Sequence, residues 1–116
     1  MTGTATPEHP ETRGEALISP AIQSILIDQF RDQLRFGSED YPDGTHLAFE
    51  PEKDATYAAC VESIKAGTVS FTDFLLMQTF EVAAETDPGR LRMTLTSLGA
   101  TVVQWIESLD SRYGGM

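Results

Sequence analysis

The sequence predicts an all-α protein of four helices, and three observations support this fold class. Apolar residues recur at intervals of three and four residues over several long segments, which is the spacing of one face of a helix. Residues that cap helices well precede these segments, and glycines follow them. No two segments show the alternation of apolar and polar residues that a pair of half-buried strands requires.

The first predicted helix follows a tail without periodicity. Residues 1–17 are rich in Thr, Pro, Glu and Gly, so we expect them to be disordered and residues 18–116 to form one helical domain. Ser19 is a good N-cap, Pro20 suits the first helical position, and Gly37 ends the helix. The apolar stripe of this helix consists of Ile22, Ile25, Leu26, Phe30 and Leu34.

Turn-forming residues separate the next two predicted helices from the first. Pro42, Asp43 and Gly44 predict a turn, because proline presets φ and glycine accepts a positive φ. A helix built largely on alanines follows, from about Pro51 to Gly67. The segment 70–73 then resembles a capping box, which predicts a third helix that runs to about residue 85.

The last predicted helix is the longest. Asp87 caps it, Pro88 occupies its first turn, and Gly114 and Gly115 stop it. A helix of ~25 residues is ~37 Å long, more than one small bundle covers. We therefore expect a homodimer or higher homo-oligomer to complete the bundle. The apolar repeat consists of Leu91, Leu95, Leu98, Val102, Ile106, Leu109 and Tyr113.

Composition excludes several classes of partner. The net charge is −10, with 18 acidic residues against 8 basic ones, so nucleic acid and anionic membranes are not expected as partners. No apolar run is long enough to span a bilayer, and the N-terminus lacks the pattern of a signal peptide, so we expect a cytoplasmic protein. Cys60 is the only cysteine, so we expect no internal disulfide and no zinc site built on cysteines. His9 and His46 have no helical spacing to another metal-binding residue, and we expect both in solvent.

Polar residues share one face on each of the last two predicted helices. Gln78, Glu81 and Glu85 are spaced by three and four residues, and Thr94, Ser97 and Thr101 repeat in the same way. If the two helices pack antiparallel, Glu81 faces Thr94 and Ser97. Such a seam is either a pocket or solvated surface, and composition alone favours the surface.

From "YPDGT" to "WIESLDSR" the chain resembles a compact actinobacterial branch of the MazG-like, all-α nucleoside triphosphate pyrophosphohydrolases. The resemblance covers about two thirds of the chain, and it depends on the order and spacing of several motifs. These are Pro42-Asp43-Gly44-Thr45, the Ser70-Phe71 helix start, "AETDPGRLR" at 84–92, Trp105-Ile106-Glu107, Leu109-Asp110 and Arg112.

The resemblance implies a metal site, but most of its ligands are replaced. The family carries Glu-Glu-x-x-Glu on one helix and Glu-x-x-Asp on the next, and these acids hold Mg²⁺ for attack of water on a phosphorus. On this sequence the first two glutamates become Met77 and Gln78, the third is kept as Glu81, and the acids of the second helix become Thr94 and Ser97. A single glutamate compensates too little charge to hold Mg²⁺ well, so no metal ligands are predicted.

Three functions follow from this resemblance. The first is a MazG-like protein without its metal site, whose inter-helix pocket is reused for a small organic ligand or a metal-independent reaction, with no cofactor. The second is a non-catalytic, dimeric interaction subunit, and the third a pyrophosphohydrolase that still uses Mg²⁺. Whether the chain is an enzyme therefore stays open. In the first function Glu81 is the catalytic residue, as general base or hydrogen-bond acceptor, and the pocket consists of Met77, Gln78, Thr94, Ser97 and Trp105.

Overall fold

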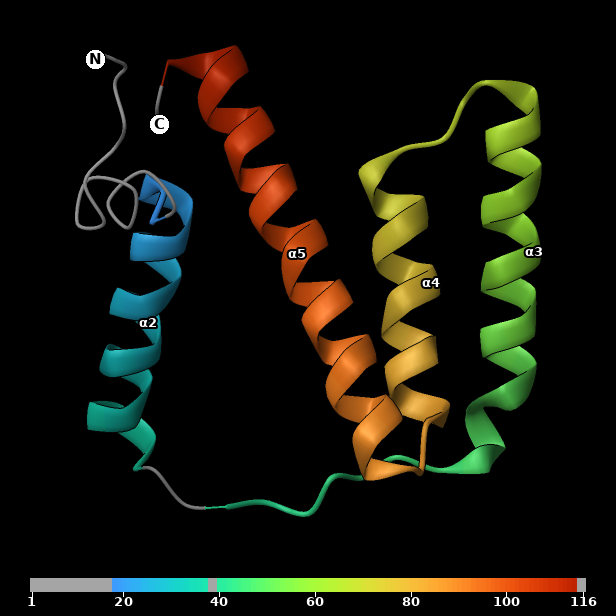
Figure 1. Ribbon diagram of the computed structural model, residues 1–116, viewed down its shortest axis with the longest axis horizontal. Helices are drawn as coiled ribbons and strands as arrows, with labels where there is room; N and C mark the ends of the chain where they lie inside the picture. Colours follow the sequence, from blue (N-terminus) through green and yellow to red (C-terminus); the bar gives the residue numbers. More distant parts are fainter. Residues whose placement is uncertain (1–17, 38–39, 115–116) are drawn as a thin grey trace, which may run out of the picture. The chain divides into compact units, whose positions relative to one another are not determined.

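A computed structural model of the chain describes residues 18–37 and 40–114. These residues form four α-helices and no strand, which confirms the prediction of an all-α protein. The predicted tail, residues 1–17, lies outside the described residues. In chain order the elements are α2 (Pro20–Phe36), the short 3₁₀ helix η1 (Leu47–Phe49), α3 (Glu50–Ala66), α4 (Phe71–Ala84) and α5 (Pro88–Tyr113) (Figure 1).

Capping residues determine where these helices begin and end. The hydroxyl of Ser19 accepts a hydrogen bond from the N–H of Ile22, and the carboxylate of Asp87 accepts one from the N–H of Arg90. Gly67 and Gly114 both have φ of +73° and end α3 and α5 in the left-handed conformation that glycine adopts without strain. The boundaries predicted from these residues are confirmed.

The start of α4 is held by a complete capping box. The Ser70 hydroxyl accepts a hydrogen bond from the N–H of Asp73 at 3.2 Å, and the Asp73 carboxylate accepts one from the N–H of Ser70 at 2.9 Å. Two backbone donors that the first turn leaves without partners are thereby satisfied. The capping box predicted at residues 70–73 is confirmed.

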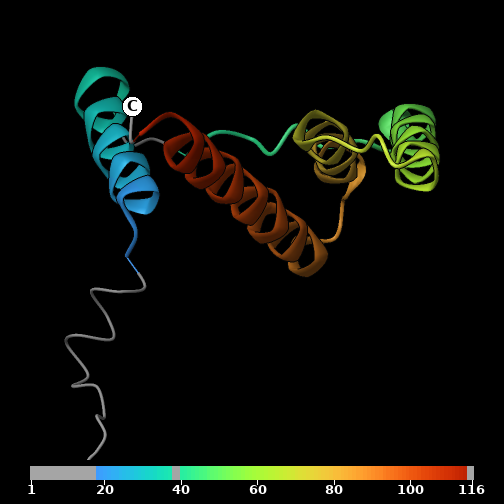
Figure 2. The ribbon, with the colours of Figure 1, turned by 90° about the horizontal axis from the view of Figure 1, so that it is seen from above.

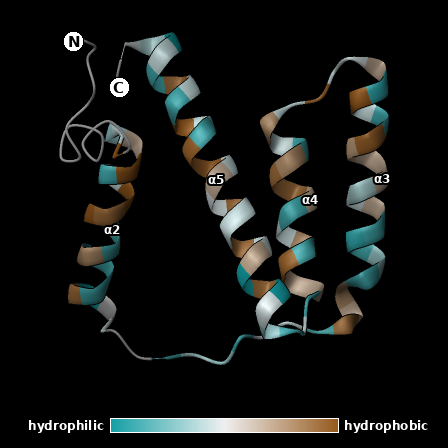
Figure 3. Cartoon of the chain, in the orientation of Figure 1, coloured by the Kyte–Doolittle hydropathy of each residue, from teal (hydrophilic) through white to brown (hydrophobic). Residues whose placement is uncertain are grey.

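The chain divides after Asp40 into two compact units. In the first, α2 is an amphipathic helix whose apolar stripe has no cover from the described residues of that unit. Exposure along this stripe rises from 36% at Ile25 to 61% at Phe30 and 74% at Leu34. Figure 3 shows hydrophobic and hydrophilic residues alternating along α2. A stripe of this kind is typical of a helix that packs on another element.

The second unit, residues 41–116, is a single layer of three helices. Short connections join α3 to α4 and α4 to α5, so neighbouring helices run in opposite directions (Figure 1). Both α3 and α5 pack on α4, whereas α3 and α5 do not pack on each other in the described part of the chain. Seen from above in Figure 2, α4 accordingly lies between α5 and α3. Within the second unit, no further helix covers either face of this layer.

The η1 segment closes one end of this layer. The N–H of His46 donates a hydrogen bond to the carbonyl oxygen of Ala83 at 2.8 Å, and the Nδ1 atom of His46 accepts one from the N–H of Ala48. The rings of Phe49 and Phe80 lie 6.4 Å apart. His46 therefore caps η1 and joins it to α4.

The buried core of the second unit is small. Among its described residues, only Cys60, Ala84, Leu91 and Thr101 have less than a tenth of their surface exposed. The apolar repeat predicted on the last helix is therefore only partly covered: Leu91 is buried, but Leu95 is 48% exposed. No described helix is both long and apolar enough to cross a membrane.

Candidate functional site

The predicted site residues Met77, Gln78 and Glu81 lie on the middle turns of α4. Because α3 and α5 pack on opposite sides of this helix, each of the three side chains is half-buried. On a helix, residues seven apart share a face, so Met77 lies on the same side as the buried Ala84. Gln78 is turned about 100° from Met77 around the helix, and Glu81 follows Gln78 after three residues.

Gln78 carries the one enclosed side-chain polar atom without a partner in the described part of the chain. Its Oε1 atom is buried and accepts no hydrogen bond. A buried acceptor that has lost its water and gained no donor costs about 1–3 kcal/mol. Gln78 therefore destabilises the isolated chain unless another molecule supplies a donor.

The charge of Glu81 on α4 acts on Cys60 of the neighbouring helix α3. Burial, together with the charges of Asp73 and Glu81, raises the pKa of the Cys60 thiol, and Cys60 is 2% exposed. Among the described residues, Glu81 forms no hydrogen bond and no ion pair. The Glu81 carboxylate is therefore half-buried on α4, near α3, and no described cation compensates its charge.

Thr94 and Ser97 do not join Glu81 in a hydrogen-bonded seam in the described structure. The hydroxyl of Thr94 donates within its own helix, with the carbonyl oxygens of Arg90 and Leu91 at 3.1 Å and 3.0 Å. Ser97 is exposed. Their roles in a pocket stay predictions, since a rotation about one side-chain bond releases the Thr94 hydroxyl.

Trp105, the remaining predicted pocket residue, is half-buried and stacks on Phe71. The ring centroids lie 5.6 Å apart and the planes are inclined by 12°. The contact joins the first residue of α4 to α5. A tryptophan can anchor two helices or form a platform on which a ligand stacks, and this contact supports the anchor.

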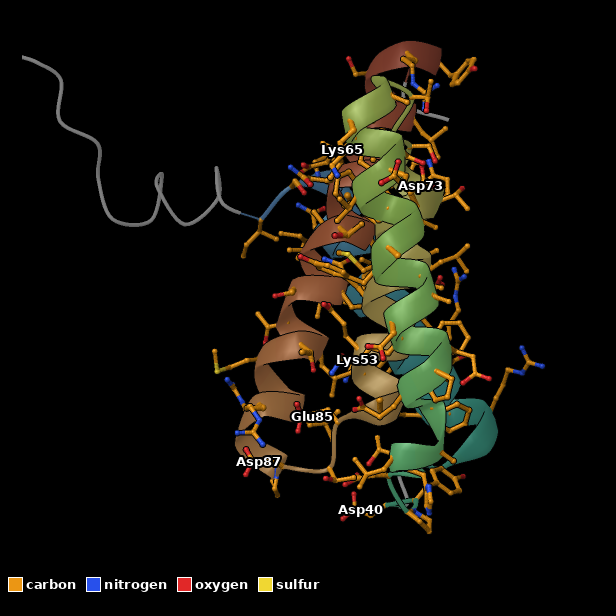
Figure 4. The ribbon with its side chains drawn as sticks, turned by 90° about the vertical axis from the view of Figure 1, so that its right-hand side faces the viewer. Asp40, Lys53, Lys65, Asp73, Glu85 and Asp87 are labelled. Atoms are coloured by element: carbon orange, nitrogen blue, oxygen red, sulfur yellow. The ribbon has the colours of Figure 1, made fainter. Side chains whose placement is uncertain are left out.

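The connection between α4 and α5 forms a small polar network that the sequence indicated only in part. As a basic residue in the first turn of α5, Arg90 opposes the helix dipole, which favours a carboxylate nearby; its Nε atom lies 3.4 Å from a carboxylate oxygen of Glu85. The other oxygen of Glu85 accepts a hydrogen bond from the N–H of Asp87 at 2.9 Å. This backbone hydrogen bond and the charge of Arg90 lower the pKa of Glu85. Figure 4 shows Glu85 and Asp87 together at this corner.

Two structural features that a ligand site often shows are not present in the described residues. They contain no group of three or more His, Cys, Asp or Glu side chains placed to hold a metal ion. They also enclose no pocket. The candidate site is thus a half-buried patch on α4, defined by Gln78 and Glu81, rather than a formed cavity.

Comparison with protein-family models, curated proteins and solved structures finds no match to this chain. The resemblance to the MazG-like family therefore stays a prediction based on the motifs in the sequence.

Proposed function

We propose that this chain is a non-catalytic, self-associating helical subunit. The observation that carries the proposal is the single layer of the second unit, in which α4 has a neighbour on each side but no further helix of that unit covers either face. A single layer of helices cannot bury an apolar face on each of its members, so compact domains stack at least two layers. Association of copies supplies the second layer.

Exposed apolar side chains support this proposal. Single exposed apolar side chains are common on protein surfaces, so the proposal depends on a second copy that covers several of them together. Burying one such side chain completely stabilises a complex by about 1.5–3 kcal/mol, whereas association itself costs at least ~4 kcal/mol. Several half-exposed side chains from each copy are therefore needed. The second unit offers Ile64 at 51% exposed, Leu76 at 47%, Leu95 at 48%, Met93 at 69% and Tyr113 at 60%.

The replaced acids of the MazG-like motif agree with a subunit of this kind. Met77, Gln78, Thr94 and Ser97 leave Glu81 as the only carboxylate of the implied set. A scaffold that no longer binds metal keeps its helix packing surfaces, since these depend on apolar residues at other positions.

The proposal is tested by the molar mass of the full chain in solution. The molar mass is measured by light scattering after size exclusion and by sedimentation equilibrium, at chain concentrations from micromolar to nearly millimolar. At the highest concentrations it should be at least twice the mass of one chain. The melting temperature should rise with chain concentration, because unfolding is then coupled to dissociation. A single-chain mass throughout, with a constant melting temperature, would contradict the proposal.

A reused ligand site is the second candidate function, and the enclosed Oε1 atom of Gln78 favours it. A ligand that donates a hydrogen bond to this oxygen would remove the cost of leaving it without a partner. Glu81, three residues further along α4, is the predicted base or acceptor beside it.

A thermal-shift screen with neutral donors, such as nucleosides, primary amides and small alcohols, tests the second candidate. A hit should raise the melting temperature of the wild-type chain, and both Gln78→Met and Glu81→Gln should abolish that rise. Thr72→Ser, an exposed substitution on the same helix, is the control that should preserve it. Calorimetric titration with Mg²⁺ should detect no binding, and micromolar binding would favour the pyrophosphohydrolase instead.

A further inference from the structure

One face of α5 is turned about a third of a turn from the side that packs on α4, and it carries charged residues at both ends with apolar residues between them. Its first half is exposed, whereas Val103, Ile106 and Asp110 in its second half are half-buried. We define this outer α5 face by six residues that fall within about 80° of the helix circumference. The buried residues Leu91 and Thr101 mark the side that packs on α4, about a third of a turn away. The outer α5 face consists of Arg92, Leu95, Gly99, Val103, Ile106 and Asp110.

The centre of this face lacks a side chain. Gly99 is exposed, and apart from its chain neighbours and the nearby backbone of its own helix, a Cβ atom built there would meet no described atom within 4 Å. Glycine in the middle of a helix costs about 1 kcal/mol relative to alanine, and no close contact among the described residues requires it here. Leu95, one turn before, is 48% exposed. The space above Gly99 is open to a second helix.

The charges at the two ends of the face have no partners within the described residues. Arg92 forms no ion pair there, in contrast to Arg90, which pairs with Glu85. The Asp110 carboxylate is half-buried and likewise forms none. A chain with a net charge of −10 has few cations to leave unpaired.

The face is self-complementary under two-fold rotation. Arg92 and Asp110 lie nine residues before and after Thr101, and Gly99 and Val103 lie two residues before and after it. In an antiparallel pair of α5 helices centred at this level, Arg92 of each copy falls opposite Asp110 of the other, ~13.5 Å from the centre. Gly99 falls opposite Val103, and Leu95 falls near Ile106. A contact of residue i with j and of j with i is the signature of a two-fold interface.

From this arrangement we propose that a second copy of this chain docks antiparallel on the outer α5 face, with Arg92–Asp110 ion pairs at both ends. The inference rests on the proposed self-association and adds its surface and register. A different protein would need opposite charges but no symmetry about Thr101, so the symmetry identifies a second copy. The small Gly99 lets the two helix backbones approach closely, and the ion pairs select the antiparallel register.

Charge exchange tests the register. The dissociation constant of the full-length dimer is measured by sedimentation equilibrium for Arg92→Glu, Asp110→Arg and the double variant. Each single reversal places like charges together at both ends and should raise the dissociation constant at least tenfold. The double variant restores opposite charges and should return it to within a few-fold of wild type.

The outcomes separate this inference from the proposed function. A dimeric wild type with single variants of unchanged affinity, or with a double variant as weak as the singles, would overturn the outer α5 face and leave self-association standing. A monomeric wild type would overturn both.

A second measurement does not depend on the ion pairs. Gly99→Glu puts a long charged side chain at the centre of the proposed contact, where the chain itself has open space, so the helix should keep its circular dichroism. The dimer should be lost. Gln104→Glu adds the same charge at an exposed position outside the outer α5 face and should leave the dissociation constant unchanged. Wild-type affinity in Gly99→Glu would overturn the proposal.

Discussion

Phe71 stacks on Trp105, and this contact places the beginning of α4 level with the last third of α5. α4 has 14 residues and α5 has 26, so the two cannot cover each other along their full lengths. The eight residues of α5 after Trp105 run beyond the first residue of α4. One aromatic pair thus determines which part of the longest helix lacks support from α4.

Replacing Phe71 by alanine should destabilise the second unit by about 2–3 kcal/mol, less than a fully buried phenylalanine because this one is half-buried. Trp105 is the only tryptophan, so its fluorescence reports this contact and should shift to the red. Urea unfolding followed by that emission measures both effects. Phe71→Leu is the matched control: it keeps most of the apolar contact and should cost about half as much. Wild-type stability in Phe71→Leu would show that ring stacking contributes nothing.

Replacing Gln78 by methionine should raise the free energy of unfolding by about 1 kcal/mol. The substitution preserves the length of the side chain and removes an enclosed oxygen without a hydrogen-bond partner. Chemical unfolding of the purified chain measures the change. Thr79→Ser, at the exposed neighbouring position, controls for effects on the helix itself. A loss of stability in Gln78→Met would instead show that the oxygen has a donor in solution.

The stability of the chain should decrease as the pH rises above about 8.5, the usual pKa of an unfolded cysteine. Burial and the nearby Asp73 and Glu81 charges raise the pKa of Cys60 in the folded state. The unfolded chain therefore loses the thiol proton first, and between the two pKa values alkali favours unfolding. Unfolding by urea at a series of pH values measures this slope. Cys60→Ala should reduce the decrease of the free energy of unfolding with pH. An unchanged slope in this variant would show that other groups cause the decrease.

Acid should weaken the corner between α4 and α5. The pKa of Glu85 is lowered by the hydrogen bond from the Asp87 N–H and by Arg90. The stabilisation of the folded chain by ionised Glu85 is therefore fully present above about pH 4.3, the ordinary pKa of glutamate. It is lost as the pH falls through the pKa of Glu85 in the folded state. At neutral pH, Glu85→Gln should lower the urea midpoint, and the difference from wild type should narrow in acid.

Glu62→Gln is the matched control for the acid experiment. Glu62 pairs with Lys65 at 3.7 Å, but both side chains are about 70% exposed. Such surface pairs contribute little to stability, so this variant should follow the wild-type acid profile. If Glu62→Gln and Glu85→Gln changed the acid profile of stability equally, Glu85 would stabilise the chain no more than a surface ion pair does.

Local chemistry explains why the helix boundaries could be predicted. Ser19, Ser70 and Asp87 act as caps through hydrogen bonds within their own turn, and Gly67 and Gly114 end helices through their own backbone conformation. These interactions span at most a few residues, so a pattern in the sequence is sufficient to recognise them.

The candidate site could be predicted less completely, because it depends on which helices meet. Residue spacing placed Gln78 and Glu81 on one face of α4, but it could not show that the Gln78 oxygen is enclosed without a donor. Nor could it show that the Thr94 hydroxyl turns back onto its own helix. Nor did spacing show that the Glu85 side chain is only 19% exposed and accepts a hydrogen bond from the N–H of Asp87.

By itself, the sequence determined four helices, their ends and the amphipathic faces of α2 and α5, since each depends on contacts between residues close in the chain. Only the tertiary structure decided that α4 lies between α3 and α5 in one layer, which leaves Leu91 buried and Leu95 exposed on the same apolar repeat. The physical reason is that a periodic stripe shows which side of a helix is apolar. How much of that side finds a partner depends on the lengths and order of the helices that pack against it.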